Sequence, residues 1–158
     1  MEILGRLRDF LDKNNVQYQH TSHGRVYTAR EAAFAEHLPP HNFAKTVVFF
    51  SENGYGMAVL PADTLVDLNQ LRQDLGLARL RLATESELDE LFSDCEVGAM
   101  PPFGNLYGIP VYMDSIMTGQ QAITFNAGTH QDVVHMRLRD YERLVKPAVV
   151  PFIRVAAV

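Results

Sequence analysis

The sequence predicts a mixed α/β (α+β) fold, in which helices pack on a single, mostly antiparallel sheet of about seven strands. The chain has 158 residues, 47% of them hydrophobic and 21% charged, which is the size and composition of one globular domain. Short β-branched and aromatic runs alternate with helical patterns. Some runs are joined by tight turns, which require antiparallel pairing, and others by helices, so a mixed sheet covered by helices is expected.

The first part of the chain predicts a helix, a strand and a second helix. In 3–14, five apolar residues fall on one helical face: Ile3, Leu4, Leu7, Phe10 and Leu11. Alternation over 16–20 predicts a short strand. Thr28 and Glu31 have the spacing of a capping box, which predicts the start of a helix, and Pro39 and Pro40 end it.

A β-hairpin and a third helix follow. The β-branched and aromatic run 43–50 predicts a buried strand, and 55–60 predicts the returning strand, which Pro61 ends. Asn53 and Gly54 predict the turn between them, because both residue types tolerate positive φ. Leucines at helical spacing then predict a helix that Gly76 closes: Leu68, Leu71 and Leu75.

The second half predicts four more strands and two short helices. The strands are expected at 78–82, 109–113, 121–126 and 133–138, and the helices at 84–92, opened by a Thr84–Glu87 capping box, and at 140–145. The segment 93–108 has the glycines and prolines of a long loop, which usually covers or forms a site. The apolar tail 147–158 is a last strand, a packing arm or a contact between subunits.

Composition excludes several classes of protein. The net charge is −5 and the pI about 5.6, whereas proteins that coat duplex DNA are basic. The single cysteine, Cys95, excludes an internal disulfide and a cysteine-built zinc site. No apolar run reaches the roughly 18 to 20 residues that span a bilayer, and the N-terminus lacks a positively charged leader. We expect a cytoplasmic protein with no metal or cofactor, no duplex DNA partner and no membrane contact.

Lys45 is the first candidate for chemistry. Only this one of the three lysines stands at the start of a buried strand. An ammonium there either meets an anion or a carbonyl oxygen, or extends to water as an ordinary strand-edge charge. Asp63 either orients this lysine or caps the helix that follows.

Two glycine-containing segments are further candidates. Closely spaced glycines and prolines in 98–104 make a turn that lets the backbone approach a ligand, or a loop shaped only for packing. In the segment 126–130, Gly128 can expose backbone N–H groups to an oxyanion, while Thr129 and His130 add a hydroxyl and an imidazole. The alternative for this segment is a hairpin turn with incidental polar residues.

Several segments together resemble the YbaK/prolyl-tRNA-synthetase-associated family. They are AKTVVFF, LPADTLVDL, PPFG followed by GIPVYMD, and FNAGTH, and the resemblance covers roughly residues 20–145. It implies one YbaK-like domain over 1–158, with 147–158 as a tail, that acts in trans as an aminoacyl-tRNA deacylase. The implied catalytic residues are Lys45, Gly128 and His130. The implied substrate-binding residues are Thr46, Asp63, Gly98, Pro102, Phe103, Gly104, Asn126 and Thr129.

The resemblance implies hydrolysis of a mischarged aminoacyl-tRNA, with tRNA for proline or a related tRNA carrying a small amino acid. The partner is then the acceptor end of the tRNA, with water attacking the ester and backbone N–H groups near Gly128 stabilising the oxyanion. Residues 28–34 with Met100 and Phe103 are expected as pocket walls or as plain core. The alternative function is a non-catalytic module that binds an amino acid, an aminoacyl nucleotide or a protein, and the tail leaves a homodimer open.

Overall fold

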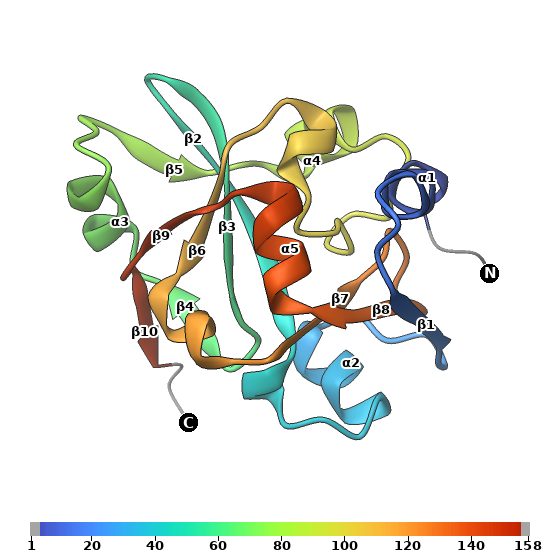
Figure 1. Cartoon of the computed structure of the whole chain (residues 1–158). Coiled ribbons are helices and arrows are strands. Elements are labelled where there is room, and N and C mark those ends of the chain that lie inside the picture. Colours follow the sequence, from blue (N-terminus) through green and yellow to red (C-terminus); the bar gives the residue numbers. More distant parts are fainter. Residues whose placement is uncertain (1–3, 156–158) are drawn as a thin grey trace.

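An eight-stranded mixed sheet forms the centre of the protein, in a computed structural model that describes residues 4–155. The strand order is β1-β8-β7-β2-β3-β6-β9, and β5 pairs with β2 beside this path (Figure 1). The strands are β1 (Tyr18–Ser22), β2 (Ala44–Ser51), β3 (Gly54–Pro61), β5 (Leu80–Leu82), β6 (Val111–Asp114), β7 (Ala122–Asn126), β8 (Asp132–Arg137) and β9 (Ala148–Val150). A separate ribbon pairs β4 (Thr64–Val66) with β10 (Ile153–Val155).

Antiparallel pairing predominates, as the tight turns predict. Five of the eight strand pairings are antiparallel, and β2–β7, β3–β6 and β6–β9 are parallel. The main sheet has eight strands, in agreement with the prediction of about seven, and a separate two-stranded ribbon brings the described residues to ten strands. The additional strands β4, β9 and β10 have three residues each, which is too short for alternation to show in the sequence.

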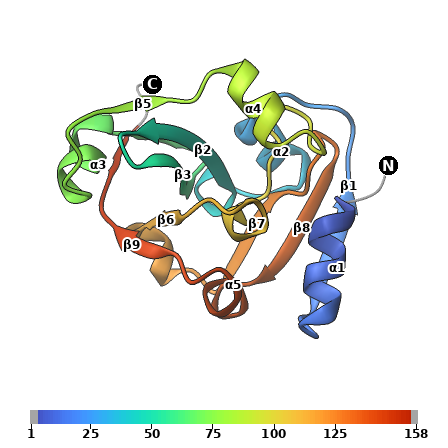
Figure 2. The same ribbon diagram turned by 90° about the horizontal axis from the view of Figure 1, so that it is seen from above.

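Helices cover both faces of the sheet. They are α1 (Gly5–Lys13), α2 (Ala29–Ala35), α3 (Leu68–Asp74), α4 (Glu85–Leu91) and α5 (Leu138–Val145), with 3-10 turns η1 (Pro40–Asn42), η2 (Gly104–Tyr107) and η3 (Ser115–Gly119). Viewed from above, α5 and α2 lie on opposite sides of the sheet (Figure 2). We call these sides the α5 face and the α2 face. No helix in residues 4–155 is long and apolar enough to cross a membrane.

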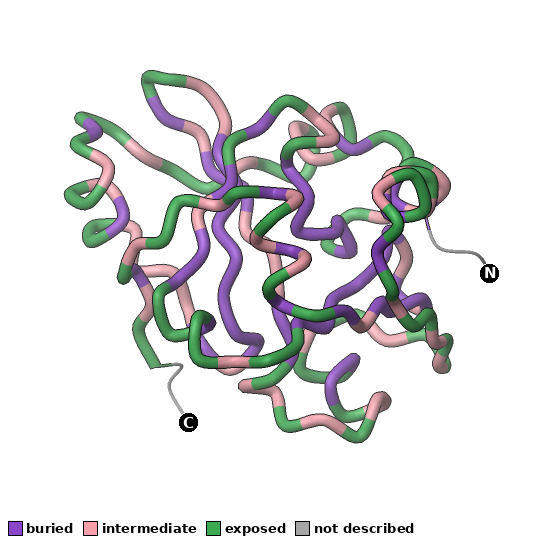
Figure 3. The backbone as a smooth tube through the Cα atoms, in the orientation of Figure 1, coloured by how far each residue is buried: buried purple, intermediate pink, exposed green. Residues whose placement is uncertain are grey.

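The main hydrophobic core lies on the α5 face. Strand residues Val48, Val59 and Phe125 pack there against Leu7 of α1 and Tyr141 of α5. Two smaller clusters lie on the α2 face, one beneath α2 and one beneath α3. The central strands are buried along most of their length (Figure 3). This burial fixes the register, since a slip by one residue would exchange the two faces.

Local sequence signals account for most element boundaries. Both capping boxes form, with Thr28 and Thr84 each accepting from the backbone N–H three residues on. The predicted first helix is confirmed from Gly5 onward, and its residue Ile3 lies outside the described residues. The predicted strand 16–20 forms two residues later, as β1. The tail folds into β9 and β10, which confirms the alternative of a last strand.

The hairpin between β2 and β3 forms with a different turn from the predicted one. Ser51 pairs with Gly54, and Gly54 has φ +102°. Asn53 does not adopt positive φ, so the expectation that both turn residues would do so was wrong. A single glycine after the turn supplies the left-handed residue that antiparallel strands need.

Candidate active site

Lys45 projects from β2 onto the α2 face. Its neighbours Ala44 and Val48 belong to the core on the α5 face, while Phe43 packs beneath α2, and side chains alternate along a strand. The Lys45 Nζ lies 3.5 Å from the carbonyl oxygen of Ala62, and the ammonium forms no ion pair with any described residue. A half-buried ammonium with one long hydrogen bond is under-coordinated.

Burial sets the pKa of Lys45. Desolvation lowers the pKa of the ammonium below its ordinary value, the charge of Arg30 on α2 lowers it further, and the charge of Asp63 opposes both. Asp63 itself is half-buried and lies 3.3 Å from His41 Nδ1. The cap of the following helix α3 is Asp67, so the expectation that Asp63 caps that helix was wrong.

Asn126 lies on the adjacent strand and faces the same side. Ala44 and Phe125 are partners in the parallel β2–β7 pair and both face the α5 side, so the next residues, Lys45 and Asn126, both face α2. Asn126 is 8% exposed, and its buried Oδ1 has no hydrogen-bond partner among the described residues. An unpaired buried acceptor is destabilising by about 1–3 kcal/mol, so this oxygen would gain from a donor that residues 4–155 do not supply.

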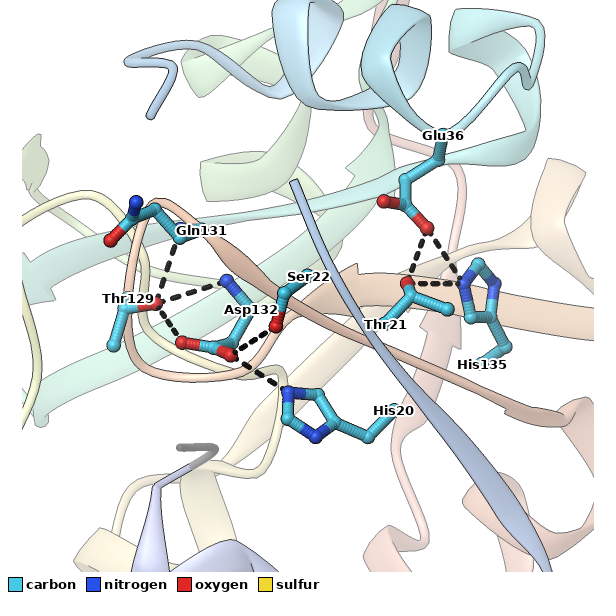
Figure 4. A network of polar contacts seen from close by, with 8 residues as sticks. All are labelled: His20, Thr21, Ser22, Glu36, Thr129, Gln131, Asp132 and His135. Carbon is cyan, nitrogen blue, oxygen red and sulfur yellow. Dashed lines mark hydrogen bonds and ion pairs between the residues drawn. The ribbon is translucent and has the colours of Figure 1, made fainter. Parts of the chain in front are cut away.

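Helix α2 covers this face and is held at both ends. The Thr28 capping box fixes its N-terminal end, and Ala32 and Ala33 are fully buried beneath it. At the other end, the carboxylate of Glu36, 7% exposed, accepts a hydrogen bond from the hydroxyl of Thr21 and pairs with His135 Nε2 at 3.0 Å (Figure 4). The pair therefore joins the end of α2 to strands β1 and β8.

A second network ties β1 to the turn that follows β7. The Asp132 carboxylate is fully buried and meets His20 Nε2 at 2.7 Å and the hydroxyls of Ser22 and Thr129 (Figure 4). Burial by itself would raise the pKa of Asp132, but the hydrogen bonds from these three side chains outweigh it and lower the pKa. The Thr129 hydroxyl also accepts from the N–H of Asp132 and of Gln131, so it stabilises the turn, and its contact with a substrate stays a prediction.

The loop 98–104 and the turn at Gly128 lie side by side. The N–H of Gly128 donates to the carbonyl of Ala99 at 2.9 Å, and the N–H of Glu96 donates to the carbonyl of Gly128 at 2.8 Å. The N–H of Gly128 itself is therefore engaged within the fold, and stabilisation of an oxyanion by backbone N–H groups near Gly128 stays a prediction. Gly128 is required for its φ of +100° and because a Cβ atom would lie 2.8 Å from the Cβ of Leu4.

Gly98 and His130 meet at one end of α2. An added Cβ on Gly98 would lie 3.4 Å from the ring of His130, whose Nε2 lies 2.8 Å from the carbonyl oxygen of Val97. The His130 ring is buried, and its centroid lies 6.0 Å from that of Tyr27, just before α2. These two predicted residues therefore border the α2 face.

The remaining predicted site residues lie on the other face of the sheet. Phe103 is fully buried against Phe125 and Tyr141, and the Pro102 carbonyl accepts from the Tyr141 hydroxyl at 2.6 Å. Gly104 allows close approach to a backbone carbonyl of the chain itself, since an added Cβ would lie 2.5 Å from the Ile109 oxygen. Pro102, Phe103 and Gly104 thus pack within the fold, and their contact with a substrate stays a prediction.

Thr46 also belongs to the α5 face. Its hydroxyl donates to the carbonyl of Met100 at 3.1 Å, so it ties β2 to the loop and points away from Lys45. Met100, expected as a pocket wall, is buried in the main core. The predicted loop thus supports the sheet from behind, and only its first residues reach the α2 face.

Three functional features were missed from the sequence. They are the exposed Arg30, the buried Glu36–His135 pair and the buried carboxylate of Asp132. A glutamate at the C-terminal end of a helix opposes the helix dipole, which was the one available signal for Glu36. No group of three or more histidine, cysteine or acidic side chains in residues 4–155 is placed to hold a metal ion.

Comparisons with known proteins agree with this architecture. The family model described as the aminoacyl-tRNA editing domain matches residues 23–144. The multifunctional Ser/Thr-tRNA deacylase ProXp-y of Escherichia coli is 36% identical over 105 residues, which are 66% of this chain and 62% of that protein. The prolyl-tRNA editing protein ProX of Acetoanaerobium sticklandii is 24% identical over 142 residues, 86% of each chain. The chain thus spans less than two thirds of the length of its Escherichia coli relative.

Solved structures show the same fold. A proposed trans-editing enzyme for prolyl tRNA synthetase aligns with a TM-score of 0.82 at 23% identity, over 94% of this chain and 95% of that one. A hypothetical protein aligns with a TM-score of 0.85 at 18% identity, over 94% and 99%. The family resemblance found in the sequence is confirmed. Since the family model covers well over half of the chain, this protein belongs to the aminoacyl-tRNA editing domain family.

Proposed function

We propose that the protein is a trans-editing hydrolase of the cytoplasm that removes a small amino acid from a mischarged tRNA, either tRNA for proline or a related tRNA. Family membership supports this proposal. The main supporting observation is that two groups with too few hydrogen-bond partners among the described residues, Lys45 and Asn126, lie on the same face of the sheet. Lys45 offers an ammonium with one long hydrogen bond, and Asn126 offers a buried oxygen with none.

An aminoacyl ester has the complementary groups. Its carbonyl oxygen and the phosphate of the terminal adenosine accept hydrogen bonds, and either would pair with Lys45. Its α-ammonium group donates hydrogen bonds and would supply the donor that Asn126 Oδ1 lacks. The two residues together would hold the ester by the groups that every aminoacyl-tRNA carries.

The ester is already activated, so the reaction needs a placed water and a stabilised oxyanion more than a protein nucleophile. Water oxygen adds to the carbonyl carbon, and the ammonium of Lys45 stabilises the negative charge that develops on the carbonyl oxygen. The ester C–O bond then breaks, and the tRNA oxygen takes up a proton from the attacking water. The products are the free amino acid and a tRNA with a free terminal hydroxyl.

Selection for a small amino acid agrees with the close packing of α2 on the sheet. The helix approaches through alanines, Ala32 and Ala33, and is held at its C-terminal end by the buried Glu36 carboxylate. One methylene changes binding by only about 1–3 kcal/mol, so a synthetase mischarges small analogues that a second, smaller site removes.

A panel of tRNAs charged with alanine, serine, threonine and cysteine tests the proposal. We expect the protein to release one or more of these amino acids, and Lys45→Ala to lose that activity with an unchanged circular dichroism spectrum. A panel left entirely uncleaved would overturn the proposal. Calorimetry that detects binding of an uncleaved ligand, weakened by Lys45→Ala, would instead support the alternative of a non-catalytic binding module on the same fold.

A further inference from the structure

Two exposed aromatic rings lie on α2 and on the residue just before its N-cap. Phe34 is 85% exposed and Tyr27 is 70% exposed, and all other large hydrophobic side chains that are exposed in residues 4–155 are aliphatic. Arg30 and Phe34 lie four residues apart within α2 and so share one side of the helix, whereas Tyr27 lies just before the N-cap Thr28, next to His130 and the guanidinium of Arg25. We call Tyr27, Arg30 and Phe34 the α2 stripe.

The guanidinium in the α2 stripe is unpaired. Arg6, Arg25, Arg81 and Arg143 each form an ion pair with a carboxylate, whereas the Arg30 side chain has no ion pair or hydrogen bond with any described residue. The same holds for the side chains of Arg79, Arg137, Arg139 and Arg154, but these do not lie on α2. An exposed apolar residue by itself needs no explanation. Phe34 and Arg30 on α2, with Tyr27 and its neighbour Arg25 just before the helix, combine aromatic rings with positive charge.

The α2 stripe borders the candidate active site. The Tyr27 ring lies beside His130, with centroids 6.0 Å apart, and Arg30 is close enough to Lys45 to act on its charge. In the fold, α2 lies next to the start of β2 and to the β7–β8 pair (Figure 1). A ligand bound at Lys45 and Asn126 would therefore leave the site across or beside this helix.

We propose that the α2 stripe binds the unpaired 3′-terminal nucleotides of the tRNA, with the bases stacked on Tyr27 and Phe34 and a phosphate on Arg30. The proposal rests on the proposed function. Proteins hold single-stranded RNA by stacking bases on aromatic rings and by pairing cations with the backbone, and both groups are present here. Charge favours RNA over an apolar partner, because two otherwise unpaired cations, Arg30 and Lys45, stand together on a protein of net charge −5.

The test uses a fluorescent single-stranded RNA that ends in the acceptor sequence CCA, together with full-length aminoacyl-tRNA. We expect Phe34→Ala and Tyr27→Ala each to weaken binding of the RNA by roughly 10-fold or more. In deacylation, KM for the tRNA should rise while kcat changes little. Phe34→Trp should restore binding, because it replaces one stacking ring by another, whereas Phe34→Leu should not.

Val155→Ala is the matched control. Val155 is 83% exposed but lies on β10, in the separate ribbon, so this variant should bind RNA like the unchanged protein. Equal RNA affinity in Phe34→Ala, Tyr27→Ala and the control would overturn the proposal. So would a lower sedimentation coefficient of Phe34→Ala alone with unchanged RNA affinity, since the ring would then join two copies of the chain. If the protein binds the RNA through the α2 stripe but cleaves no aminoacyl-tRNA, the proposed hydrolysis is refuted and RNA binding by the α2 stripe is supported.

Discussion

Lys45 shows how one residue can be unfavourable for stability and useful for chemistry. The fold buries half of its side chain and supplies one long hydrogen bond in return. The ammonium is therefore poorly solvated before any substrate arrives, and it gains most from an oxygen that a substrate brings. Activity and stability should respond in opposite directions to its removal.

Replacing Lys45 by methionine should abolish deacylation and stabilise the fold at neutral pH. Loss of one oxyanion-stabilising group reduces kcat by about 100- to 1,000-fold. Because burial lowers the pKa of Lys45 in the folded protein, its protonated form destabilises the fold, and this penalty decreases as pH rises through the folded-state pKa toward about 10. Urea titrations should therefore find the advantage of Lys45→Met largest near pH 7 and smaller at pH 10. An advantage that grows with pH would contradict the argument.

Asn126→Leu separates a binding role from a structural one. Since Oδ1 has no partner within residues 4–155, an apolar side chain of similar size removes a buried acceptor and should leave the free energy of unfolding unchanged or raise it by about 1 kcal/mol. The KM for aminoacyl-tRNA should rise about 10-fold or more, because the α-ammonium group loses its acceptor. Thermal unfolding and steady-state kinetics measure the two effects. A strongly destabilised variant would indicate a structural role for this amide.

At the scale of elements, α2 owes its position to contacts at its ends. Its seven residues are too few for a stable helix on their own, so packing and caps must hold it. The capping box is local in sequence, whereas the Glu36–His135 pair joins residues 99 positions apart. The first was visible in the sequence and the second was not.

Glu36→Ala should weaken the attachment of the C-terminal end of α2 to strands β1 and β8. Removing a buried charged hydrogen-bond partner of Thr21 and His135 should lower the free energy of unfolding by about 1.5–3 kcal/mol. The discrimination between small and larger amino acids should also decrease, because the helix covers the site. Glu90→Ala, which removes an exposed glutamate from α4, provides the control. It should change neither the free energy of unfolding nor the discrimination between small and larger amino acids. Equal effects of the two substitutions on urea denaturation would exclude this role for Glu36.

Asp132→Asn tests the network between β1 and the β7–β8 turn. The pKa of Asp132 is lowered in the folded protein, so its carboxylate stabilises the fold above the unfolded value near 4 and loses that effect as pH falls through the folded-state pKa. The variant should be less stable by about 1–3 kcal/mol at pH 7. The difference should shrink below about pH 4, as measured by acid-dependent thermal unfolding. A difference independent of pH would mean that the charge is not involved.

At the scale of the whole molecule, charge limits how the protein can hold tRNA. The net charge is −5, and Arg81 and Arg143, which belong to two arginine-rich segments, are paired with Glu87 and Asp140. A net negative charge disfavours a broad electrostatic contact with an acceptor stem. Recognition should depend mainly on the aminoacyl end and the nucleotides beside it.

The salt dependence of tRNA binding measures how many phosphate groups the protein neutralises. If about two or three phosphates are neutralised at single-stranded nucleotides, the slope of log K against log salt concentration should be about −1.4 to −2. Anisotropy titrations at several potassium chloride concentrations give that slope. Arg30→Gln should reduce its magnitude by about 0.7. A slope steeper than about −5 would indicate an extensive basic interface instead.

The sequence by itself determined the element types and the family. Capping boxes, prolines and alternation act over a few residues, so they were visible at Thr28, Thr84 and in the β2–β3 hairpin without any tertiary information. The sequence also indicated that Lys45 lies at the start of a strand and that 98–104 lies in a loop, and the structure has both there.

Only the tertiary structure decided which side of the sheet each of these residues faces. Lys45 and Thr46 are adjacent in sequence, yet strand alternation sends one to the α2 face and the other to the loop behind the sheet. Hydrogen bonds between distant segments engage the Gly128 amide and place Glu36 against His135. Such pairings depend on which strands become neighbours, and no local pattern contains that information, because it arises from the burial of both faces of the whole sheet at once.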